Sequence, residues 1–294
     1  MSKDKVREFN NEVYRALVDD LINDAFYTPG ISKRGIVAKI RQCAEVVLRR
    51  ILNIEPKKSL TLGSKKTVSK VKEKNCTFLE TSVHNINKMG SKCTHTQYKN
   101  EITEVDVKAA IDNLFNLYAY LLIEYFQKYE FGSNLEIIHH FSLLPPIIRY
   151  LTLEYLHNKY PENTMIIDKL SLAILKAFNN EQALCWIEER KEKLQTMPSI
   201  SEKAEKDIID KSGEDIGRLI IEQAPNMYDN CVQNVNLVAQ NISENGKLYI
   251  DFESAIEYYQ SIGPVQGDSD EIKEFNSIME FLYLGRKSIK DLKE

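Results

Sequence analysis

The stretch from Ile86 to Gln97, INKMGSKCTHTQ, crowds small, turn-forming and ionisable residues between two helical patterns. His95 carries an imidazole ring, the side chain that proteins most often use to transfer protons, and Lys92 places a positive charge three residues earlier. Gly90 permits a chain reversal, and we expect a turn here that presents His95. His95 then either anchors the turn through one ring nitrogen or contacts a phosphate-bearing ligand.

A second candidate for chemistry is the basic segment 57–74, KKSLTLGSKKTVSKVKEK. Its seven lysines face a single acidic residue, so the local charge is +6 (7 − 1). A glycine, several serines and the lack of a strong period predict a loop or a weak helix. Such a segment is either a solvated loop or a contact to a phosphate backbone. The second interpretation assigns nucleic-acid contacts to Lys65, Lys66, Lys70, Lys72 and, from the turn, Lys92.

The remaining histidines, the cysteines and the common catalytic motifs give weaker evidence for a functional site. The neighbours His139 and His140 point about 100° apart on a helix, so they do not share a metal as residues i and i+4 do. The five cysteines are scattered and never spaced C-x-x-C, which predicts reduced thiols with neither a disulfide framework nor a zinc site. The chain also lacks a glycine-rich phosphate loop, a G-x-S-x-G elbow and an H-E-x-x-H motif. We therefore expect no metal and no cofactor.

Composition limits the class of protein. The chain has 294 residues, 43% of them hydrophobic, which is enough for one large or two smaller domains. The net charge of -4 is unevenly spread: residues 1–147 carry +5 (22 − 17) and residues 148–294 carry −9 (17 − 26). The basic half can steer a phosphate backbone locally. No segment approaches the roughly 20 apolar residues of a membrane span, so we expect a cytoplasmic protein without membrane contact.

Apolar periodicity predicts helices through nearly the whole chain. Thr103 and Asp106 predict a capping box at the start of the longest one, and KLYIDF at 247–252 is a candidate strand. The first helix should place Val6, Phe9, Val13, Leu17 and Leu21 on its inner face. Helices are expected at 6–26, 32–54, 78–89, 105–129, 134–144, 147–158, 164–178, 181–195, 205–222, 226–244 and 270–284.

The order of the predicted helices resembles that of a known protein family. A helix RGIVAKIRQCAEVVLRRIL, a basic connector, a helix FLETSVHNINKMGSKCTH and a capped helix EITEVDVKAAIDNLFNLYAYLLIEYF together resemble the domain-of-unknown-function 4145 family, a branch of the HEPN helical bundles. The similarity covers about residues 30–128. It implies an all-α fold with an up-and-down HEPN-like bundle at 1–131. For the rest of the chain, the pattern of the residues themselves predicts a helical extension at 132–196 and a mostly helical, acidic carboxyl-terminal region at 203–294.

The resemblance also implies an activity. Active HEPN members are metal-independent ribonucleases in which an Arg precedes a His; the His transfers protons while the Arg stabilises charge on the phosphate. This chain has Lys88 and His95 in those places, and Ser91 where the family has Asn after glycine. A lysine supplies a point charge without the bidentate fork of an arginine, so the transition state would be held less firmly.

Three functional hypotheses result. The favoured one is an HEPN-like helical protein of a prokaryotic defence or toxin–antitoxin system that acts by binding RNA, another nucleic acid or a protein. The first alternative is a metal-independent endoribonuclease that uses His95 with Lys88. The second alternative is a non-catalytic dimerisation scaffold. Expected partners are therefore RNA or another nucleic acid, a second copy of the chain, or a partner protein from the same system.

Overall fold

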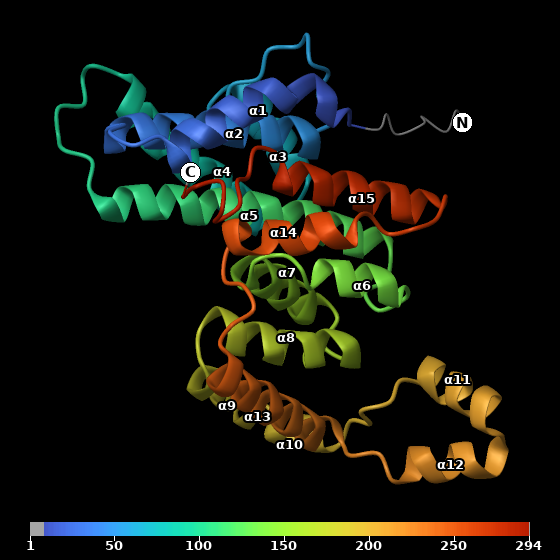
Figure 1. The fold of residues 1–294 in the computed structure, drawn as a ribbon. Helices are drawn as coiled ribbons and strands as arrows, with labels where there is room; N and C mark the ends of the chain where they lie inside the picture. Colours follow the sequence, from blue (N-terminus) through green and yellow to red (C-terminus); the bar gives the residue numbers. More distant parts are fainter. Residues whose placement is uncertain (1–8, 294) are drawn as a thin grey trace, which may run out of the picture. The chain divides into compact units, whose positions relative to one another are not determined.

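The computed structural model describes residues 9–293 and shows an all-α protein, with fifteen α-helices and no β-strand in that range (Figure 1). The sequence-based expectation of an all-α fold is thus confirmed for the described residues. None of the helices in this range has the length and apolar character needed to cross a membrane. The five cysteines are all free thiols.

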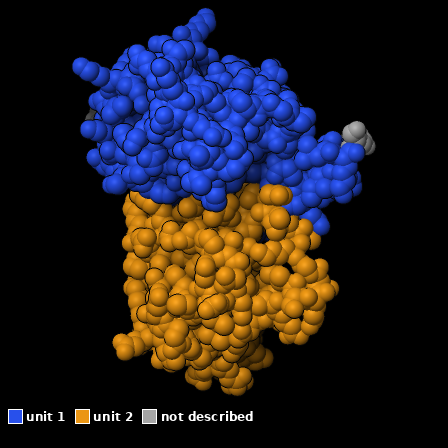
Figure 2. All heavy atoms as spheres, turned by 90° about the vertical axis from the view of Figure 1, so that its left-hand side faces the viewer, with its two compact units in different colours: residues 1–129, 139–143, 252–294 blue, residues 130–138, 144–251 orange. Residues whose placement is uncertain are grey.

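The described chain divides into two compact units, coloured separately in Figure 2. Unit 1 comprises the described residues up to Tyr129, His139–Leu143 and the described residues from Phe252 onward, and unit 2 comprises Glu130–Ile138 and Leu144–Asp251. The segment 203–294, expected as one region, is therefore shared between the units. Its last two helices belong to unit 1 because their aromatic side chains pack there, as shown below.

The helices of unit 1 are α1 (Arg15–Ile22), α2 (Lys33–Ile51), α3 (Lys65–Glu73), α4 (Thr77–Thr94), α5 (Glu104–Lys128), α14 (Phe252–Ile262) and α15 (Asp270–Tyr283). The helices of unit 2 are α7 (Pro146–Lys159), α8 (Thr164–Ala177), α9 (Asn180–Glu188), α10 (Lys191–Gln195), α11 (Glu202–Ser212), α12 (Glu214–Glu222) and α13 (Met227–Asn245). The remaining helix, α6 (Leu135–Phe141), begins in unit 2 and ends in unit 1.

Three long helices, α2, α4 and α5, form the centre of unit 1. The predicted capping box begins α5: the Thr103 amide donates to Asp106 Oδ2 at 2.9 Å, and the Asp106 amide donates to Thr103 Oγ1 at 3.3 Å. Burying each large apolar side chain stabilises the fold by about 1.5–3 kcal/mol relative to exposure. The fully buried residues at this centre include Ile40, Leu48, Leu79, Ile86, Leu114 and Leu117.

Helices α14 and α15 complete the core of unit 1 by packing aromatic rings on α5. The ring centroid of Phe252 lies 6.1 Å from that of Phe115 and 6.2 Å from that of Tyr118. The ring of Phe275 lies 5.4 Å from Tyr125. Residues far apart in the sequence therefore share one core, which explains why the carboxyl-terminal helices group with the amino-terminal ones.

The first helix differs in register from the sequence prediction. Val6 lies outside the described residues, and Val13 and Leu17, predicted to face inward, are 54% and 49% exposed. Tyr14 and Val18 are buried in their place. The physical reason is the winding: a tight 3₁₀ turn at Asn11–Tyr14 precedes α1, and a π-helical turn at Asn23–Tyr27 follows it, so the uniform α-period used for the prediction does not hold.

The predicted strand KLYIDF is wrong. Residues 247–251 are irregular, and α14 begins at Phe252, which is fully buried in unit 1. A strand needs a partner strand for its backbone groups, and the described chain offers none here. In unit 2 the Lys247 ammonium instead donates to the Lys176 carbonyl at 2.9 Å, and the Arg149 guanidinium lies 5.8 Å from the Tyr249 ring centroid.

Candidate nucleic-acid interface

The basic segment forms a regular helix, α3, where a loop or weak helix was predicted. Ser64 caps it by accepting a hydrogen bond from the Thr67 amide at 3.2 Å, and the two hydroxyls lie 2.9 Å apart. Thr67 and Val71, four residues apart, are buried and dock one face of the helix on unit 1. Capping and docking together stabilise a nine-residue helix that would be marginal in isolation.

The opposite face of α3 carries the predicted nucleic-acid contacts. Lys65, Lys66 and Lys72 are exposed and Lys70 is half-exposed. No ion pair joins any of these four ammonium groups to a carboxylate in the described chain, whereas the next lysine, Lys74, is held 2.5 Å from Glu124 Oε1. Two of the four lie in the first turn, where the helix dipole disfavours positive charge by about 0.3–1 kcal/mol each. The helix thus presents uncompensated positive charge to solvent.

The amino-terminal end of α3 lies against the middle of α4. A Cβ atom placed on Gly63 would lie only 2.8 Å from Nδ2 of Asn87, so the chain passes this point at close range. The residue after Asn87 is Lys88, which is exposed. Lys88 therefore follows directly on the residue of α4 that meets the chain just before α3, two residues ahead of Lys65.

The predicted turn at Gly90 is wrong, because α4 continues through it to Thr94. Gly90 is buried, and a Cβ atom there would lie 2.0 Å from Cδ and 2.8 Å from Cβ of Arg41 on α2. The glycine therefore allows two helices to approach closely across the Arg41 side chain. Arg41 in turn lies 3.6 Å from Glu45 Oε1. Sequence inspection could not distinguish this role from a turn.

His95 caps the carboxyl end of α4. Its amide donates to the Ser91 carbonyl at 3.2 Å, and its own carbonyl accepts from the Tyr98 amide at 3.2 Å. The residue is exposed, and the described chain supplies no hydrogen-bond partner for the imidazole ring. Lys88 precedes it by seven residues, about two helical turns earlier in α4.

Arg34 on α2, which the sequence reasoning missed, holds the chain that follows α4. Its guanidinium donates to the carbonyls of Lys92 at 2.7 Å, Tyr98 at 3.3 Å and Asn100 at 3.0 Å. The Lys92 ammonium lies 5.2 Å from the Tyr98 ring centroid. The loop seen beyond α4 in Figure 1 is therefore anchored by an arginine, and that anchoring does not require the His95 ring. An arginine early in a helix gives no sequence signal of such a role.

Burial governs the ionisable groups near this surface. It raises the pKa of the Cys93 thiol, an effect that the positive charge of Arg34 only partly offsets, so Cys93 is a poor nucleophile at neutral pH. Burial likewise raises the pKa of Glu45, against the charge of Arg41.

In the described chain no group of three or more His, Cys, Asp and Glu is placed to hold a metal ion. His140 is buried, with Nε2 3.2 Å from the Gly263 carbonyl, and His139 is exposed.

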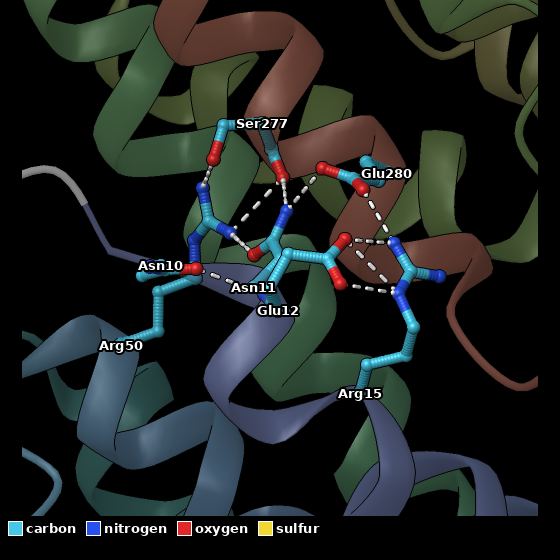
Figure 3. A network of polar contacts seen from close by, with 7 residues as sticks. All are labelled: Asn10, Asn11, Glu12, Arg15, Arg50, Ser277 and Glu280. Carbon is cyan, nitrogen blue, oxygen red and sulfur yellow. Dashed lines mark hydrogen bonds and ion pairs between the residues drawn. The ribbon is translucent and has the colours of Figure 1, made fainter.

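A second surface of unit 1 contains two hollows, of about 600 Å³ and about 710 Å³, which share Tyr259 and Glu280. The Arg50 guanidinium donates to Asn11 Oδ1 at 2.8 Å, Asn11 Nδ2 donates to Glu280 Oε2 at 2.7 Å, and Arg15 donates to Glu280 Oε1 at 2.8 Å (Figure 3). Arg50 also donates to the Ser277 hydroxyl at 3.0 Å. Since these polar groups bond one another, the network fastens the amino-terminal segment to α2 and α15.

The chain matches no family model, no curated protein and no solved structure. The resemblance to the HEPN helical bundles therefore stays a prediction, and function must be argued from the surface itself.

Proposed function

We propose that unit 1 binds a nucleic acid, in the first place RNA, through a basic face made by Lys65, Lys66, Lys70 and Lys72 of α3 and Lys88 of α4. One observation carries the proposal: four lysines stand on a capped, docked helix, and none is paired with a carboxylate in the described chain. A phosphate backbone supplies a row of negative charges that such a helix can neutralise.

Several lysines elsewhere in the chain are paired with a carboxylate. The ammonium groups of Lys39 and Lys108 each lie 2.7 Å from an aspartate oxygen, and Lys169 lies 3.0 Å from Asp168. Mutual repulsion among the α3 lysines has no such relief. A bound polyanion removes this repulsion and releases its own condensed counterions, so association with a phosphate backbone is favourable and salt-dependent. Lys92, whose ammonium group lies near the Tyr98 ring, remains a further candidate contact to the phosphate backbone.

The choice of RNA, and of a prokaryotic defence or toxin–antitoxin setting, rests on the resemblance of residues 30–128 to HEPN bundles. The uncompensated lysines support a polyanion of any kind. A non-catalytic dimerisation scaffold needs no such charge, so the charge on α3 favours the nucleic-acid hypothesis over the scaffold alternative.

Ribonuclease activity is the second candidate, favoured by the exposed ring of His95 at the end of α4. A general base must come within about 2.6–3.2 Å of the proton it removes, and a free imidazole can do so. Lys88 can neutralise the same phosphate only if its long side chain extends along α4 toward His95. We therefore rank binding above cleavage.

The proposal is tested by titrating labelled single-stranded RNA with the protein across a salt series. With four to five lysine contacts, the slope of log affinity against log salt should be about −3. The variant Lys65→Gln/Lys66→Gln/Lys70→Gln should bind at least about tenfold more weakly, with a slope smaller in magnitude by about 2. Wild type and His95→Ala are then each incubated with the RNA in EDTA. Intact RNA with wild type indicates binding alone, and RNA cut by wild type but not by His95→Ala indicates metal-independent cleavage.

A matched control removes the same charge elsewhere. Lys159, Lys206 and Lys211 are exposed lysines of unit 2, and Lys159→Gln/Lys206→Gln/Lys211→Gln should keep both the affinity and the slope of the wild type. If wild type fails to bind RNA, or if the two triple variants bind equally, the basic face is only a solvated surface. Equal cleavage by wild type and His95→Ala would rule out catalysis by His95.

A further inference from the structure

Helix α12 in unit 2 exposes three large apolar side chains in one stripe. Ile216 is 60% exposed, Leu219 53% and Ile220 43%. Positions i, i+3 and i+4 lie on one face of a helix, so the three form a single apolar surface. Single exposed apolar residues are ordinary, but three adjacent ones on a nine-residue helix mark a surface suited to a partner.

The stripe is not covered by the neighbouring helix. Helices α11 and α12 form a hairpin whose contact lies at Gly217, where a Cβ atom would be 2.9 Å from Cα of Ile209. Among the residues of this hairpin whose burial the structure describes, only Gly217 is buried, so none of the described side chains is. Helices of eleven and nine residues gain little stability alone, so covering the stripe would stabilise the hairpin substantially.

The charges beside the stripe restrict what can cover it. Helix α12 carries three acidic residues and one basic residue, a net charge of −2 (1 − 3). Arg218 is already paired with Glu214 at 2.7 Å. Asp215 and Glu222, seven residues apart on the same side of the helix, have no ion-pair partner in the described chain. Two uncompensated carboxylates therefore border the stripe on its Leu219 side.

From these observations we infer that the stripe of α12 docks an amphipathic helix of a partner protein, with apolar residues at spacings of three and four and Lys or Arg on its flanks. Apolar burial supplies affinity, and the basic flanks meet Asp215 and Glu222. A second copy of this chain fits less well, because a two-fold contact between two α12 helices would bring like-charged borders together. The inference concerns unit 2 and does not depend on RNA binding by unit 1.

Two labelled synthetic peptides provide the test with the full-length protein. Both carry leucines at helical spacings of three and four; one has lysines on the flanks and the other has glutamates. Fluorescence anisotropy should show the lysine peptide binding at least about tenfold more tightly than the glutamate peptide. Asp215→Lys/Glu222→Lys should reverse this preference. Leu219→Asp should weaken binding of the lysine peptide at least about tenfold, although it adds negative charge.

The matched control is Leu237→Asp on α13, which makes the same change at a leucine that is 68% exposed outside the stripe. It should change the affinity by less than about twofold. Circular dichroism verifies that each variant is folded. Equal binding of the lysine peptide by wild type and Leu219→Asp overturns the inference. A second result would also overturn it: wild type is a dimer in sedimentation, Leu219→Asp dissociates this dimer, and Leu237→Asp does not. That result would assign the stripe to a second copy of the chain.

Discussion

At the scale of residues, two arginines of α2 determine the geometry around α4. Arg34 bonds the Lys92 carbonyl in the last turn of α4 and two backbone carbonyls beyond the helix, and Arg41 lies across Gly90 within it. Because Arg34 fixes the loop, the ring of His95 is not needed for that purpose and remains exposed to solvent. The end of α4 and the loop after it are thus positioned by an arginine that contacts backbone carbonyls, and the His95 ring is left without that role.

The role of Gly90 leads to a stability prediction. Gly90→Ala places a methyl group 2.0 Å from Cδ of Arg41, so α2 and α4 must shift apart. Overpacking costs about 1–3 kcal/mol, and a contact this short should fall in the upper part of that range, of which the higher helix propensity of alanine offsets about 1 kcal/mol. We expect urea unfolding to show a net loss of about 1–2 kcal/mol in the free energy of unfolding.

The control for this prediction is Ser91→Ala, the next residue along α4, which is half-exposed. It should change the free energy of unfolding by less than about 0.5 kcal/mol. A Gly90→Ala protein as stable as wild type would show that α2 and α4 do not depend on the close approach at this point.

At the scale of elements, the segment after α15 is held by a buried cation. The side chain of Arg286 is 1% exposed, its Nη1 lies 3.5 Å from Glu253 Oε1, and its guanidinium carbon lies 4.4 Å from the ring centroids of Phe26 and Phe252. The Tyr27 hydroxyl donates to the same Glu253 oxygen at 2.5 Å. The amino-terminal segment, α14 and the carboxyl-terminal segment therefore converge on one buried group.

This cluster predicts alkaline sensitivity. Burial raises the pKa of Tyr118 to about 12, although the positive charge of Arg286 opposes the shift. An unfolded tyrosine titrates near pH 10, so below about pH 10 the hydroxyl is protonated in both states and stability is unaffected. Between about pH 10 and 12 only the unfolded state releases the proton, so the free energy of unfolding should fall by about 2–3 kcal/mol for this group.

Urea unfolding from about pH 9 to about pH 12 measures the effect. Tyr118→Phe removes the titrating group and should make the decline shallower, whereas Tyr160→Phe, at an exposed tyrosine of unit 2, should follow wild type. A Tyr118→Phe protein with the same decline as wild type would assign the alkaline sensitivity to other buried groups. Tyr27 and the Cys43 thiol are the first of these, because burial also raises their pKa values to about 12.

At the scale of the whole molecule, unit 1 is built from segments at both ends of the described chain. Phe252 and Phe275 pack on α5, and the Tyr283 hydroxyl donates to the Leu143 carbonyl at 2.8 Å. Residues up to Tyr129 therefore lack part of their core unless the last helices are present. Unit 2, by contrast, is formed by one nearly continuous stretch of sequence.

A truncation tests this division. A chain ending at Asp251 should lose the cooperative unfolding transition of unit 1, because large apolar surfaces of α5 become exposed. Proteolysis and thermal unfolding by circular dichroism measure the loss. Replacing α11 and α12 by a short linker, a control deletion within unit 2, should leave that transition unchanged. Retention of the transition in the chain ending at Asp251 would favour residues 1–131 as an independent domain.

The sequence by itself determined the features that depend on neighbours along the chain. The helical class, the long helix α5 and its capping box at Thr103 and Asp106 followed from periodicity and local hydrogen bonding. The charge of the segment 57–74 was equally plain. The conformation of this segment was not evident from the sequence, because Ser64 and Thr67 occur in loops as readily as in a helix. Burial of Val71 favours the helix.

Only the tertiary structure decided what each of the ambiguous residues does. Gly90 is compatible with a turn or with a close helix crossing, and the Arg41 side chain above it selects the second. Arg34 bonds the end of α4 and the loop after it, 58 to 66 residues away, and Phe252 completes a core begun more than one hundred residues earlier. These roles arise from contacts between distant segments, and a local pattern carries no information about a partner that folding alone brings into reach.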